Sequence, residues 1–115
     1  MPSYREDSEW NDTMELRCLL IFKRLEEKNF PRGLQMELCR VLALSSGMGA
    51  GNLSAKVCNY KSVAGINKPS NASTNTLLLY QQYGQCSIPE IIGAIEDSTA
   101  RSNMAVKSAK HTNKS

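Results

Sequence analysis

The feature that most constrains the fold of this chain is the spacing of apolar residues in segment 11–27. Leu16, Leu19 and Leu20 stand at offsets of three and four residues, and Leu25 broadens the apolar face that they form. This period is typical of an α-helix with one buried side. The segment therefore predicts a helix that other elements must cover.

Four further apolar stretches follow, and glycine or proline residues separate them. They predict helices at about 33–44, 53–63, 76–83 and 87–97. No stretch alternates well between polar and apolar residues, as a half-buried strand would. We therefore expect an all-α fold, a small orthogonal bundle of four to five helices. A small hairpin in the Asn-rich segment 66–75 is the alternative at that point.

The chain of 115 residues is long enough for one domain with one modest core. We expect residues 1–97 to form that single helical domain. From residue 98 onward the sequence is small, polar and basic, and the composition predicts a disordered tail, 98–115.

The cysteine and histidine pattern gives no metal-binding signature. The four cysteines are widely spaced, and the single histidine, His111, lies in the predicted tail. Two disulfides are formally possible, but we interpret the cysteines as free, small apolar residues of a reducing compartment. We expect a cytoplasmic protein with no metal and no cofactor.

Membrane and enzyme classes are also disfavoured. No apolar run approaches the roughly 20 residues that span a bilayer. The acidic residues near the N-terminus, from Glu6 to Asp12, look solvated, and no histidine or paired carboxylate marks a catalytic cleft. We expect no catalytic residues, no membrane association and no small-molecule substrate.

Positive charge is concentrated in residues 28–68, where six bases face one acid. Such a concentration is typical of surfaces that contact the phosphate backbone, although a solvated face has the same composition. The basic residues of this region that we predict as nucleic-acid contacts are Arg32, Arg40, Lys56, Lys61 and Lys68, and the polar residues Asn52 and Asn59 complete the predicted set.

One motif lies inside the basic region. Asn52, Lys56, Asn59 and Tyr60 match an N-x-x-x-K-x-x-N-[FY] pattern, and Trp10 precedes the acidic, Leu-rich first helix. Over residues 10–83 the chain thereby resembles the helical module found N-terminal to HNH-type nucleases in restriction and defence systems. The resemblance implies a DNA-associated accessory module with Lys56, Asn59 and Lys61 as contacts. This chain carries no nuclease domain, and Gly47–Gly51 replaces the basic or aromatic lead-in.

Each motif residue also has a purely structural interpretation. Asn52 fits a helix cap, Tyr60 a core position, and Lys56 and Lys61 solvated positions. Asn59 lies in mid-helix, where a bond that pins the following loop would explain it. Two functions follow: a non-catalytic DNA-binding or DNA-associated module that uses a basic helix pair, or a protein-interaction factor. The second would be an inhibitor or adaptor, encoded by a phage or mobile element, that binds a host protein.

Overall fold

The computed structural model describes residues 9–66 and 72–114, with side chains as far as Arg101. Within these ranges the fold is all-α, which confirms the predicted class of small helical bundle. Its helices are α1 (Asp12–Glu27), α2 (Leu34–Ser46), α3 (Ala50–Val63), α4 (Thr74–Tyr83) and α5 (Ile88–Lys114). The described parts of segment 66–75 contain the start of α4, and no strand.

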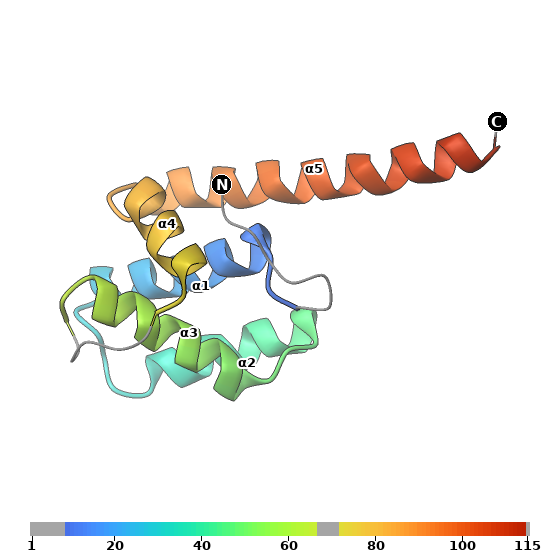
Figure 1. Cartoon of the computed structure of the whole chain (residues 1–115). Helices are drawn as coiled ribbons and strands as arrows, with labels where there is room; N and C mark the ends of the chain where they lie inside the picture. The colour runs from blue at the N-terminus through green and yellow to red at the C-terminus, as the bar shows by residue number, and fades with distance from the viewer. Residues whose placement is uncertain (1–8, 67–71, 115) are drawn as a thin grey trace.

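Helix α1 is the centre of the bundle. It packs against α2, α3, α4 and α5 (Figure 1). The side chain of Asn11 caps its first turn by accepting a hydrogen bond from the backbone N–H of Met14, at 2.9 Å. Asn11 serves as the N-cap because it has the extended backbone that this position requires.

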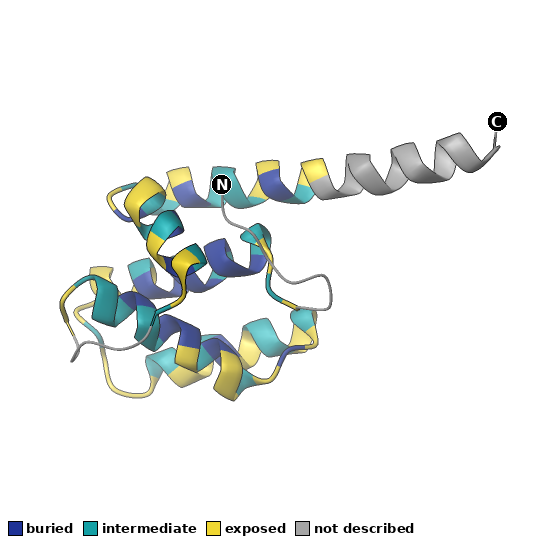
Figure 2. Cartoon of the chain, in the orientation of Figure 1, coloured by how far each residue is buried: buried dark blue, intermediate teal, exposed yellow. Residues whose placement is uncertain are grey.

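The core is built around α1, which is the most continuously buried helix, whereas α2 presents exposed residues along its length (Figure 2). Phe22 lies at the centre of the core, and its ring centroid is 6.0 Å from that of Phe30 and 6.2 Å from that of Tyr80. Such tilted and edge-on contacts are the favoured arrangement of aromatic pairs. The apolar residues that are buried on the five helices and their connections are Met14, Leu16, Cys18, Leu19, Ile21, Phe22, Leu25, Cys39, Met48, Leu53, Val57, Tyr60, Leu79 and Ile91.

All four cysteines are free, as we expected. Cys18 and Cys39 are buried, whereas Cys58 and Cys86 are half-buried. Burial, and then the nearby carboxylate of Glu15, raise the pKa of the Cys18 thiol. Cys18 is therefore a neutral packing residue and not a nucleophile.

Helix α5 departs from the prediction at residue 98. The expected end of the domain lies inside the helix, and Ser98 is buried with its hydroxyl 2.6 Å from that of Thr13 on α1. The prediction of disorder is wrong for residues 98–101. Their composition is typical of a tail, but this bond and the packing of α5 on α1 keep the segment helical. The helix continues to Lys114, but the side chains of 102–114 and all of Ser115 lie outside the described residues.

In the described part of the chain, no helix is long and apolar enough to cross a membrane.

Candidate functional site

The central lysine of the sequence motif is inside the protein. The Lys56 ammonium lies 2.8 Å from a carboxylate oxygen of Glu15 and donates a hydrogen bond to the Thr76 hydroxyl at 3.0 Å. The Tyr60 hydroxyl donates to the other Glu15 oxygen at 2.6 Å, and the Trp10 ring lies 4.6 Å from the ammonium. These contacts join α1, α3 and α4. We call this set of five residues the buried polar network.

The network leaves no buried side-chain nitrogen or oxygen atom unpaired among the described residues. The Glu15 side chain is only 1% exposed and that of Lys56 10%. An ion pair buried to this degree must satisfy its own hydrogen bonds, because solvent cannot. The Lys56 ammonium is therefore buried and already paired, so it cannot contact a phosphate. Its position does not support its predicted role as a DNA contact.

The two motif asparagines differ in their exposure to solvent. Asn52 is exposed in the first turn of α3, but it does not cap the helix, since α3 begins at Ala50 with Gly49 as its N-cap. Asn59 is half-buried and already has an interaction partner within the structure. Of the two, only Asn52 stands on the surface.

The remaining predicted contacts do not form one patch. Lys61 donates to the side-chain oxygen of Gln35 at 2.9 Å and lies 5.4 Å from the centre of the Phe30 ring. Arg32 is exposed in the connection between α1 and α2, and Arg40 is exposed on α2. Lys68 lies outside the described residues. In the ranges 9–66 and 72–101, acids and bases are equal in number, at nine each, so the body of the domain is not a basic surface.

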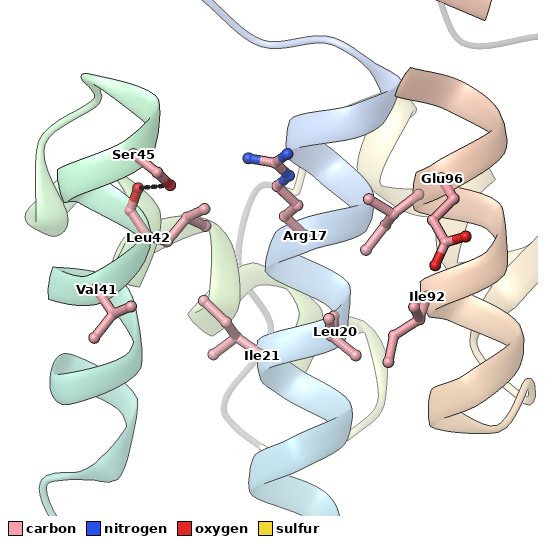
Figure 3. A pocket seen from close by; sticks show the side chains of 9 residues that line it. Arg17, Leu20, Ile21, Val41, Leu42, Ser45, Ile92 and Glu96 are labelled. Atoms are coloured by element: carbon pink, nitrogen blue, oxygen red, sulfur yellow. Dashed lines mark hydrogen bonds between the residues drawn. The ribbon is translucent and has the colours of Figure 1, made fainter. Parts of the chain in front are cut away.

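A different feature stands out on the other side of α1. An open groove of about 320 Å³ lies over α1, with α2 and α5 as its walls (Figure 3). Its lining is almost entirely apolar, with Arg17 and Glu96 as the charged members. The residues that line this groove are Arg17, Leu20, Ile21, Val41, Leu42, Ser45, Ile92, Ile95 and Glu96.

The sequence of α1 explains why a groove forms there. At 100° per residue, Leu20 and Ile21 point well away from Glu15, which faces the buried polar network. Helix α1 is thus apolar around most of its circumference and needs cover on several sides. Helices α3 and α4 pack on one side, while α2 packs mainly on α3 and α5 on α1. The strip between α2 and α5 stays open.

The apolar surface continues beyond the groove along α2. Val41, at its rim, is 62% exposed, and Leu44, one turn further on, is 89% exposed. A single exposed leucine is ordinary, but a contiguous apolar patch next to a groove is typical of an interaction site. We call the groove together with Leu44 the α2 groove.

Sequence reasoning missed this site. A signal was present in segment 34–44, where Met36 and Leu44 flank the apolar stripe that runs from Leu34 to Leu42. A helix with apolar residues outside its core-facing stripe has more apolar surface than one core contact can cover.

Among the described residues, no group of three or more histidine, cysteine, aspartate or glutamate side chains is arranged to hold a metal ion. No known family model, curated protein or solved structure matches this chain.

Proposed function

We propose that this chain is a non-catalytic protein-interaction module that binds an amphipathic helix in the α2 groove. The observation that carries the proposal is the open apolar groove over Leu20 and Ile21, continuous with the exposed side chains of Val41 and Leu44. Grooves of this kind accept helices that present apolar residues at three- and four-residue spacing.

The size and extent of the surface favour a helix over a small ligand. A cavity of about 150 Å³ holds one benzene-sized group, so the groove of about 320 Å³ has room for roughly two apolar side chains. The exposed apolar surface then runs on to Leu44, outside the groove. A bound helix covers both parts, and burial of a side chain such as Leu44 contributes about 1.5–3 kcal/mol before the costs of association.

The charged residues of the groove add specificity. Arg17 and Glu96 line it with opposite charges, and neither makes an ion pair with another described residue. Arg17 is half-buried whereas Glu96 is exposed, so a partner in the groove must above all offer a counter-charge to Arg17, because a buried unpaired charge is costly.

The proposal is tested by selecting helical peptides from a displayed amphipathic library against the immobilised full chain. Selected peptides are expected to bind the wild type and to lose binding to the Val41→Arg variant. The matched control is Ile66→Arg, because Ile66 is an exposed β-branched residue, 45% exposed, that does not line the groove. Peptides that bind both variants equally, or a library that yields no binder, would contradict the proposal.

DNA association is the second candidate, and one observation favours it. Lys28 and Arg32 are exposed in the connection between α1 and α2, and Lys61 lies against Phe30 of the same connection. Lys28 and Arg32 lie four positions apart in this connection, and both are open to an incoming phosphate backbone. This candidate DNA-binding surface does not include Lys56.

Fluorescence anisotropy with labelled duplex DNA tests this candidate. Binding is expected to weaken steeply as salt rises, and to weaken further in a Lys28→Ala/Arg32→Ala variant. Salt-insensitive binding, or an affinity that the double substitution leaves unchanged, would remove the basic connection as a DNA contact.

A further inference from the structure

Helix α2 carries the pattern that the α2 groove is suited to accept. On its exposed side, Glu37 is followed one turn later by Val41 and then by Leu44. Residues three and four apart lie on the same face of a helix, so this face presents an acid and two apolar side chains in a row. In the described part of the chain, Glu37 makes no ion pair.

The direction of α2 determines where this row of side chains would lie on a second copy of the chain. Figure 3 shows α2 running antiparallel to α1, so that Val41 lies beside Ile21 and Ser45 lies beside Arg17. Suppose a second α2 lies antiparallel to the first, with the two Val41 side chains opposite each other. Glu37 and Ser45 are each four residues from Val41, about 6 Å along the axis. Glu37 of one copy is then level with Ser45 of the other, and therefore close to its Arg17.

We propose that the helix that fills the α2 groove is α2 of a second copy of this chain. The result is a two-fold dimer in which Glu37 of each copy pairs with Arg17 of the other. This inference rests on the proposed function, and it names the partner of the same groove. The surfaces in contact are the same on both copies, so the assembly closes at two chains instead of growing into a filament.

Charge and packing agree in this arrangement. Each copy contributes two apolar side chains, Val41 and Leu44, and each receives the same two from its partner. Arg17, which is half-buried already, gains a carboxylate as it loses contact with water. A neutral or basic occupant would leave its guanidinium covered and unpaired, which is the costly outcome.

The sharpest test uses two single charge reversals, Arg17→Glu and Glu37→Arg, studied alone and mixed. In a pair of Arg17→Glu chains two carboxylates meet at each end of the interface, and in a pair of Glu37→Arg chains two guanidinium groups meet. A mixed pair has opposite charges at both ends. We expect each variant alone to dimerise at least about tenfold more weakly than the wild type. We expect an equimolar mixture to give a heterodimer, seen by native mass spectrometry and analytical ultracentrifugation.

Apolar variants provide the control. Leu44→Asp is expected to make the chain monomeric, whereas Leu77→Asp, at an exposed leucine on α4, is expected to dimerise like the wild type. Far-UV circular dichroism checks that each variant keeps its helices. Single reversals that dimerise like the wild type, or a mixture without heterodimer, would overturn the inference.

The result also separates this inference from the proposed function. A wild type that stays monomeric throughout the concentration range, yet binds selected peptides in the groove, contradicts the dimer and leaves the proposed function standing. A dimer that the Leu44→Asp variant retains contradicts the dimer built on α2.

Discussion

The two sides of α1 invert the usual distribution of polarity. On one side, Glu15 meets Lys56 and Tyr60 in a closed interior from which water is excluded. On the other side, Leu20 and Ile21 form the floor of a groove that solvent reaches. The comparison teaches that a charged pair, Glu15 and Lys56, joins two helices inside the protein, while apolar residues of the groove are left open to solvent. Residue type alone therefore points to the wrong surface.

The largest expected effect comes from breaking the polar side. Glu15→Gln removes the anion and leaves the Lys56 ammonium buried without its counter-charge. We expect the free energy of unfolding to fall by about 3–5 kcal/mol, measured by chemical denaturation. The matched control is Glu26→Gln, which removes a partly exposed ion pair with Lys23 at 2.9 Å and should cost less than about 1 kcal/mol. Equal losses of stability in the two variants would mean that burial of the Glu15–Lys56 pair does not raise the cost of breaking it.

A double variant sharpens this result. Glu15→Gln combined with Lys56→Met replaces the ion pair by neutral groups. We expect it to recover a large part of the stability lost in Glu15→Gln, because the main cost there is an unpaired buried cation and not a lost attraction. Additive losses in the two single variants would contradict this explanation.

Removing one hydrogen bond from the network has a smaller expected effect. Tyr60→Phe keeps the ring that packs 6.4 Å from Tyr80 but removes the hydroxyl that donates to Glu15. A hydrogen bond to a charged group contributes about 1.5–3 kcal/mol. We expect a loss in that range by thermal or chemical denaturation. A stability within about 0.5 kcal/mol of the wild type would show that the carboxylate does not depend on this donor.

The first turn of α5 makes a weaker, pH-dependent contribution to stability. Glu90 accepts a hydrogen bond from the backbone N–H of Ser87 at 2.8 Å, and the Ser87 hydroxyl accepts one from the backbone N–H of Glu90 at 3.3 Å. Hydrogen bonding to the Glu90 carboxylate, first from the backbone N–H of Ser87 and then from the Ser87 side chain, lowers the pKa of Glu90 from its ordinary value of 4.5. Because the folded-state pKa is the lower one, the stabilisation is present above about pH 4.5 and is lost as pH falls through the folded pKa.

We therefore expect the difference in melting temperature between wild type and Glu90→Ala to be largest near neutral pH and to shrink below pH 4.5. Thermal unfolding followed by circular dichroism at several pH values measures it. A difference that stays constant down to strongly acidic pH would show that the carboxylate does not act through its charge.

The smallest expected effect on stability comes from the groove rim. Val41→Asp changes a side chain that is already 62% exposed, so unfolding of the monomer should shift by less than about 0.5 kcal/mol. The same substitution should abolish binding to the groove. A large loss of monomer stability would mean that Val41 belongs to the core and not to an interaction surface.

Much of the fold followed from the sequence, because helical periodicity is a local property. The spacing of Leu16, Leu19 and Leu20 predicted α1, and the apolar stretch at about 87–97 predicted the start of α5. Positions whose state depends on distant residues were not predictable in this way. Lys56 looked like a surface base because its partner lies 41 positions earlier in the sequence, on another helix. Ser98 looked like the start of a tail because its partner, Thr13, lies 85 positions away.

Local sequence patterns indicated excess apolar surface on α2, but they could not predict where the groove lies. Val41 belongs to a regular apolar stripe that predicts burial, and only the placement of α5 against α1 leaves that side of α2 uncovered. A helical pattern predicts which residues are suited to burial, but not which of them the other helices pack against.

The buried polar network holds this domain together, and we propose that α2 of a second copy of the chain occupies its α2 groove. Methyl NMR spectra of the full chain, recorded over a series of protein concentrations, test it most directly. We predict that the methyl resonances of Val41, Leu44 and Ile95 shift as concentration rises, while those of Leu53 and Val57 beside the network stay in place. Shifts centred on Leu53 and Val57, or groove methyl groups that do not respond at any concentration, would contradict it.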